Sequence, residues 1–137
     1  VKELREKERK KQVKDIMSTR IITTEPGATL YDAINKMREN NIHGLLVARE
    51  GKLMGIVTTY DALLAMNRGN NIKDLLVGDV MTTNVISINQ NSSISEALEK
   101  MLESQINRLP VLDKNKLVGV VSTTDIINAY TDLVCEI

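Results

Sequence analysis

Apolar and polar positions along this chain follow two periods, and each period predicts a different kind of element. The segment "TLYDAINKMRENN" (29–41) carries apolar residues at i, i+3, i+4 and i+7, which predicts an amphipathic helix. The segment before it, "RIITTEPG" (20–27), is typical of a short strand that ends at a proline and a glycine. The apolar runs "HGLLVA" (43–48) and "KLMGIVT" (52–58) predict a β-hairpin, and a second helix is expected over 59–67.

The same order of elements returns 64 residues later along the chain. Residues 13–66 and 77–130, aligned without a gap, hold the same amino acid at 19 of 54 positions, which indicates an internal duplication. The second copy predicts a hairpin from 109–113 and 116–122, followed by a helix over 123–133. The expected fold class is therefore α+β, with two tandem β-α-β-β-α repeats. Since about 54 residues bury little surface alone, the repeats are expected to pack about a pseudo-twofold axis.

The ends of the chain and the joint between the repeats differ from the repeats in composition. The repeats are expected at 13–66 and 77–133, with a linker at 67–76 and a tail at 134–137. The first 14 residues hold seven Lys or Arg and three Glu, and glutamates precede lysines by four positions, which supports an exposed helix. Residues 1–12 are thus predicted to form a charged helical extension or a linker. Because the chain begins with Val rather than Met, a fused domain or a protein partner is an open expectation.

Composition narrows the class of protein. The chain has 137 residues, of which 42% are hydrophobic and 26% charged, as in an ordinary soluble globular protein. We find no apolar run near the roughly 18 residues that span a bilayer and no secretory leader, so a cytoplasmic protein without membrane contact is expected. Cys135 is the only cysteine, which excludes an internal disulfide. With one histidine and no metal-ligand spacing, no enzyme, metal or cofactor is predicted.

The candidate chemistry lies in "GIVTTYD" and, 64 residues later, "GVVSTTD". Each motif ends an apolar strand and opens a helix, with a hydroxyl and a carboxylate three residues apart: Thr58 with Asp61, and Ser122 with Asp125. This spacing fits a capping box, in which the two side chains satisfy free amides at a helix start. It also fits a nucleotide site, because helix N-termini favour phosphate and a carboxylate can accept bonds from both ribose hydroxyls.

From about residue 13 to 133 the sequence resembles a tandem CBS-domain pair, the regulatory module named after cystathionine beta-synthase. The resemblance rests on "VKDIMSTRIITTEPGATLYDAINKM" and "VGDVMTTNVISINQNSSISEALEKM", on "INRLPVLD", and on the two motifs above. It implies a non-catalytic sensor, with AMP, ADP, ATP or S-adenosylmethionine bound in clefts between paired repeats. The aspartate would bind the ribose, with the hydroxyl near the phosphate. The resemblance also implies a homodimer formed through the repeats.

The same resemblance implies that each cleft is shared across the repeats. The residues expected in one cleft are Thr58, Asp61, Ile86, Asn107 and Arg108, and those expected in the other are Ser122, Asp125, Ile22 and His43. Arg108 is expected to contact phosphate, which makes the Asp61 cleft the better anion site. The alternatives are a surface ion pair for Arg108 and a packed surface histidine for His43.

Two other functions stay open at this point. A purely structural dimerisation module would keep both clefts empty. A nucleic-acid-binding protein would use the basic segment 1–14, although no aromatic residue interleaves its charges. The contacts to ribose and phosphate do not distinguish one adenosine ligand from another.

Overall fold

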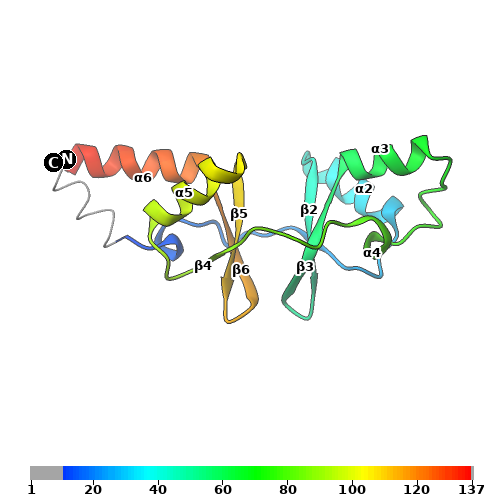
Figure 1. Ribbon diagram of the computed structural model, residues 1–137, viewed down its shortest axis with the longest axis horizontal. Coiled ribbons are helices and arrows are strands. Elements are labelled where there is room, and N and C mark those ends of the chain that lie inside the picture. Colours follow the sequence, from blue (N-terminus) through cyan, green and yellow to red (C-terminus); the bar gives the residue numbers. More distant parts are fainter. Residues whose placement is uncertain (1–10, 137) are drawn as a thin grey trace. The chain divides into compact units, whose positions relative to one another are not determined.

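The computed structural model describes residues 11–136, and Figure 1 follows the chain through them. Its contacts divide the chain into two compact units. The first unit is residues 22–85, and the second unit is residues 86–136 together with the segment 11–21. The predicted charged helix over 1–12 lies almost entirely outside the described residues.

Each unit contains the predicted order of strand, helix, strand, strand, helix, which confirms the α+β class and the duplication (Figure 1). The repeat elements of the first unit are β1 (Thr23–Thr24), α2 (Leu30–Asn40), β2 (Gly44–Arg49), β3 (Lys52–Thr58) and α3 (Thr59–Asn67). Those of the second unit are β4 (Ile88–Asn89), α5 (Ile94–Ser104), β5 (Arg108–Asp113), β6 (Lys116–Ser122) and α6 (Thr123–Glu136). The first strand of each repeat is only two residues long, and α6 runs further than the sequence predicts.

The three strands of each unit pair in the same way. In the first unit β1 is parallel to β2, and β2 is antiparallel to β3 with Gly44 opposite Thr58. The second unit repeats this arrangement, with Arg108 opposite Ser122. Both hairpins turn through two residues with positive φ, as a tight hairpin with right-handed strand twist requires. Gly51 supplies the second of these positions in the first hairpin.

One hydrophobic core lies in each unit between its strands and its helices. Most of the enclosed side chains come from the apolar faces of the two long helices and from alternate positions of the strands, as the periodicity predicts. The buried core of the first unit is Leu30, Ala33, Met37, Leu45, Val47, Val57, Ala62, Ala65 and Val77. The buried core of the second unit is Val13, Ile88, Ile94, Ala97, Met101, Leu109, Val111, Val121, Ile126, Ala129 and Leu133.

The first residues of each repeat pack in the unit that holds the strands and helices of the other repeat. Residues 11–21 belong to the second unit, where Val13 is fully buried in the core. Residues 77–85, from the start of the second repeat, belong to the first unit, where Val77 is fully buried. Each segment opens with a short helix that periodicity did not predict: η1 (Val13–Asp15) and α4 (Val77–Val80).

These segments also pair with the last strand of the unit they enter. Ile56 of β3 and Thr82 exchange two main-chain hydrogen bonds of 2.9 Å each, and Val120 of β6 and Ser18 do the same. Such pairing satisfies main-chain groups on a strand edge that would otherwise face solvent. The approach is so close that only glycine fits beneath it, since a Cβ at Gly55 would lie 2.6 Å from the Thr82 carbonyl oxygen.

Among residues 11–136, none of the helices is both long enough and apolar enough to cross a bilayer.

We expect Gly55→Ala to destabilise the protein by about 1–3 kcal/mol, because its methyl group would force Thr82 and Met81 away from β3. Urea denaturation measures the free energy of unfolding. Gly27→Ala is the matched control, since a Cβ at Gly27 meets no atom within 4 Å. Equal unfolding midpoints for the two variants would contradict the packing described here.

Candidate functional site

The motif of the first unit forms a reciprocal capping box where β3 passes into α3. The carboxylate of Asp61 accepts hydrogen bonds on Oδ2 from the Thr58 main-chain amide at 2.8 Å and from Thr58 Oγ1 at 3.0 Å. The amide of Asp61 donates back to Thr58 Oγ1 at 3.3 Å. Both side chains are half-buried. The structural interpretation of the motif is therefore confirmed for this unit.

The motif of the second unit forms the same box between β6 and α6. Asp125 accepts a hydrogen bond on Oδ2 from the Ser122 amide at 2.8 Å, and its own amide donates to Ser122 Oγ at 3.2 Å. The two other predicted helix starts are capped less completely. Thr29 and Ser93 each accept one amide bond, and the described residues show no bond returned by the acid three positions later.

The capping boxes use only one oxygen of each carboxylate. Within the described residues, the hydrogen bonds to Asp61 and Asp125 all end on Oδ2, so each Oδ1 keeps its capacity to accept. A carboxylate fixed through one oxygen holds the other in a defined position, where it can accept bonds from two neighbouring hydroxyls. Capping and ligand binding are therefore compatible uses of the same side chain.

Within each unit, the residue just before the neighbouring strand is hydrogen-bonded to the first residue of the capped helix. In the first unit the Thr59 amide donates to the His43 carbonyl oxygen at 2.9 Å, and His43 is exposed. In the second unit the Thr123 amide donates to the Asn107 carbonyl oxygen, also at 2.9 Å.

The pairing of β5 with β6 places a positively charged side chain beside the capping box of the second unit, and the matching pair of the first unit has none. Arg108 lies directly opposite Ser122, so the two side chains project on the same face of the strands. The aligned residue of the first unit, Gly44, lies opposite Thr58 and has no side chain. The structure therefore brings Arg108 to the capping box of its own unit.

The remaining predicted site residues are the two isoleucines. Ile22 is partly buried against the core of the first unit, and Ile86 is 40% exposed in the second unit. The predicted sharing of each cleft across the two repeats, including a contact of Arg108 to a ligand at Asp61, stays a prediction.

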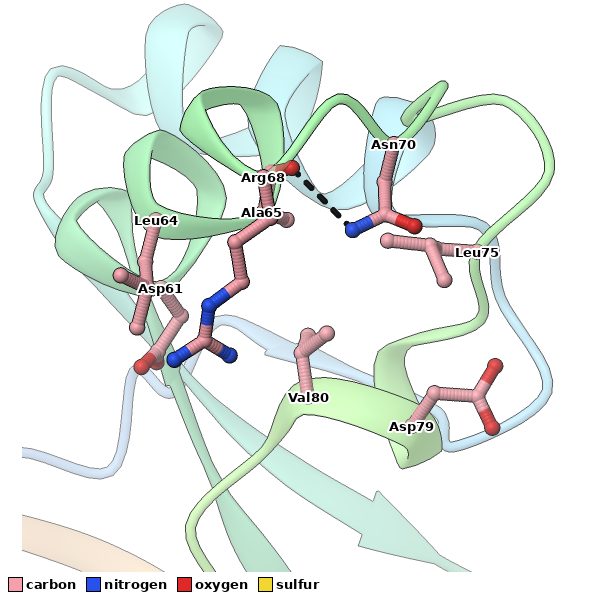
Figure 2. A pocket seen from close by; sticks show the side chains of 8 residues that line it. All are labelled: Asp61, Leu64, Ala65, Arg68, Asn70, Leu75, Asp79 and Val80. Atoms are coloured by element: carbon pink, nitrogen blue, oxygen red, sulfur yellow. Dashed lines mark hydrogen bonds between the residues drawn. The ribbon is translucent and has the colours of Figure 1, made fainter.

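A pocket that the sequence did not predict adjoins Asp61 within the first unit (Figure 2). Its volume is about 320 Å³. Its walls combine the inner side of α3, the chain that leaves this helix, and α4; the lining residues are Asp61, Leu64, Ala65, Arg68, Asn70, Leu75, Asp79 and Val80. The pocket depends on the fold-back of residues 68–80 after α3, which helical periodicity does not reveal.

Two of the polar residues in the pocket stabilise its own walls. Asn70 Nδ2 donates to the Ala65 carbonyl oxygen at 3.2 Å, as the dashed line in Figure 2 marks. Asp79 Oδ2 accepts from the Leu76 amide at 3.0 Å, at the start of α4. Among residues 11–136, His, Cys, Asp and Glu side chains form no group of three that could hold a metal ion.

Comparison with known proteins identifies the two repeats. A family model described as "CBS domain" matches residues 13–68 and again residues 77–132. The chain belongs to the CBS-domain family. The resemblance found in the motifs is thus confirmed over both repeats.

Relatives and solved structures of this family match across nearly the whole chain. The CBS domain-containing protein YhcV of Bacillus subtilis (strain 168) is 35% identical over 114 residues, which are 83% of this chain and 81% of that protein. A structure of CBSX2 in complex with AMP is 27% identical with a TM-score of 0.77, covering 89% and 97% of the two chains. CBSX2 is a CBS-pair protein of Arabidopsis thaliana.

A second CBS-pair structure was solved with different adenosyl ligands. The CBS domain pair of protein MJ0100, in complex with 5′-methylthioadenosine and S-adenosyl-L-methionine, is 29% identical with a TM-score of 0.72. The match covers 89% of this chain and 97% of that chain. The chain spans less than two thirds of the length of several other curated relatives that it matches.

We expect Ser122→Ala to lower the free energy of unfolding by about 0.5–2 kcal/mol, because the Asp125 amide loses its acceptor at the start of α6. Ser122→Thr keeps the hydroxyl and is the control. Thermal and urea denaturation of both variants measure the difference. A Ser122→Ala protein as stable as the threonine variant would show that the hydroxyl does not hold this helix start.

Proposed function

We propose that this chain is a non-catalytic regulatory module that binds an adenosine-containing ligand at the Thr58–Asp61 and Ser122–Asp125 pairs. The ligand class is AMP, ADP, ATP or S-adenosylmethionine. The observation that carries the proposal is the spare Oδ1 of each aspartate, held at a helix start by bonds to Oδ2. Each Oδ1 would accept hydrogen bonds from the two hydroxyls of a ribose.

The surroundings of the two aspartates support the same ligand class. A helix N-terminus carries a partial positive charge and favours a phosphate or another anion nearby. His43 and Asn107 lie at the strand ends beside the boxes, and Arg108 lies opposite Ser122. We assign the adenine of one ligand to the apolar surface near Ile86 and that of the other ligand to the apolar surface near Ile22.

The ligands bound in the solved relatives support an adenosyl ligand without selecting one. CBSX2 was solved with AMP, and the MJ0100 pair with 5′-methylthioadenosine and S-adenosyl-L-methionine. These ligands share the adenine and the ribose with its two vicinal hydroxyls, and they differ in the group attached to C5′. CBS-domain pairs are in general regulatory rather than catalytic. Regulation requires only that the ligand bind one arrangement of the protein more tightly than another.

We propose that a second copy of the chain covers an apolar helix face of each unit. On α3 the side chains of Tyr60, Leu63 and Met66 are exposed although they are large and apolar. On α6 Ile127 and Val134 are exposed in the same way. Leu63 and Ile127 occupy equivalent positions in the two repeats, and each is 63% exposed. Because burying such faces is favourable, a homodimer is the expected assembly.

We expect Asp61→Ala and Asp125→Ala, combined in one protein, to weaken AMP binding by about ten- to a hundred-fold. Each substitution removes the hydrogen bonds that the ribose hydroxyls donate to a charged acceptor, which contribute about 1.5–3 kcal/mol. Isothermal titration calorimetry with AMP, adenosine and S-adenosylmethionine measures the change.

The matched control for this titration is Asp32→Ala combined with Glu96→Ala. Asp32 and Glu96 also lie in the first turns of helices, and removing both changes the net charge by the same two units as the double variant does. Equal AMP affinity in the wild type and in the double variant would remove the proposed ribose contact. A wild type that binds none of the three ligands would leave a structural dimerisation module as the better description.

We expect Leu63→Glu with Ile127→Glu to convert a dimer into monomers, because each charge would be buried in the proposed interface. Leu102→Glu is the control, since Leu102 is 69% exposed on α5 and lies outside both faces. Sedimentation equilibrium gives the mass of each variant. A double variant that remains dimeric would place the interface elsewhere.

A further inference from the structure

We propose that Arg68 binds the phosphate of a nucleotide whose ribose is held by Asp61, so that the pocket of the first unit is a phosphate subsite. This inference rests on the proposed adenosine function. It concerns a residue that neither the sequence motifs nor the comparisons assign.

Two of the polar residues that line the pocket are already hydrogen-bonded to main-chain groups of its walls, whereas Arg68 is available to an anion. Asn70 is bonded to the Ala65 carbonyl, and Asp79 caps α4. The guanidinium of Arg68 makes no hydrogen bond and no ion pair with any described residue. Its donors are therefore available to a ligand, and a guanidinium matches the geometry of a phosphate group.

The side chain of Arg68 extends toward the carboxylate of Asp61, which we propose binds the ribose. Figure 2 shows its guanidinium directed along α3 to the side of Asp61, whereas the carboxylate of Asp79 points away from both. Arg68 lies seven positions after Asp61, which corresponds to two helical turns and about 10 Å along the axis. Since helical side chains lean toward the N-terminus, the long arginine side chain covers much of this distance.

The size and walls of the pocket limit what it can hold. A volume of about 320 Å³ lies at the lower end of ligand pockets, so it suits a phosphate and adjoining atoms rather than a whole dinucleotide. Leu64, Leu75 and Val80 form apolar walls. Such walls lower the local dielectric and strengthen the attraction between a guanidinium and an anion.

The duplicated sequence indicates that Arg68 is not required by the fold. The residue aligned with Arg68 in the second unit is Asp132, which has the opposite charge. Arg68 is also exposed and is the C-cap residue that follows α3. Because the two repeats share one fold although this position carries opposite charges, the arginine can serve a ligand of the first unit without a cost to the fold.

The test compares AMP with adenosine, because the two differ only by the phosphate. Both are titrated by calorimetry into the Asp125→Ala protein, which leaves the Asp61 site as the ribose site, with and without Arg68→Gln. We expect Arg68→Gln to lower the AMP affinity by about three- to ten-fold, a moderate effect since the arginine is exposed. The adenosine affinity should change by less than about two-fold, because the neutral ligand offers Arg68 no charge.

Two further variants in the same background make the result specific. Arg38→Gln removes an equal charge from an exposed arginine at the end of α2, outside the pocket, and should leave both affinities unchanged. Arg108→Gln tests the other arginine that the sequence associates with phosphate. An AMP affinity that falls with Arg108→Gln but not with Arg68→Gln would overturn the inference.

The remaining outcomes separate this inference from the proposed function. If Asp61→Ala abolishes AMP binding while Arg68→Gln leaves the ratio of AMP to adenosine affinity unchanged, the inference fails and the adenosine site stands. If neither AMP nor adenosine binds the wild-type protein, the inference fails. If S-adenosylmethionine does not bind either, the proposed function fails with it. Circular dichroism of each variant verifies that the fold is retained.

Discussion

The strand-to-helix junction in each unit depends on a reciprocal contact between a hydroxyl residue and the aspartate three positions later. Asp61 accepts two hydrogen bonds from Thr58 and returns one from its amide, and Asp125 closes the same cycle with Ser122. This contact determines where the strand ends and where the helix begins. It also holds a carboxylate in place with one oxygen unused. The stability of the helix start and the capacity to bind a ligand therefore come from the same atoms.

A second constraint explains other residues that are identical in the two repeats. Gly55 and Gly119 leave room for the segments that enter from the other repeat, and Met81 and Met17 lie against them. A conventional side chain at either glycine would displace a main-chain carbonyl. Residues that are identical in the two repeats therefore include some that the fold itself requires. The capping-box aspartates are among these, and on the proposed function they would also contact a ligand.

The sequence predicted those parts of the structure that are local. Helices, hairpins and capping boxes follow from periodicity and from spacings of three or four residues, and these interactions occur between neighbours in the chain. The short helices η1 (Val13–Asp15) and α4 (Val77–Val80) were missed because long-range packing in the other unit stabilises them, not periodicity. Arg68 was missed for a related reason. Its position beside Asp61 matters only because the chain folds back after α3, and no local pattern signals this.

The differences between the repeats are as informative as the identities. The core and the capping boxes are duplicated, whereas the charges around each aspartate are not. The first unit has Gly44 on the strand and Arg68 at the helix end, and the second unit has Arg108 on the strand and Asp132 on the helix. In the first unit the arginine near the capping box comes from the end of the helix, and in the second unit it comes from the strand. On the proposed function, one ligand would bind the two sites with unequal affinity. A module with unequal sites responds over a wider range of ligand concentration than one with two equal sites, because the weaker site begins to fill where the stronger site saturates.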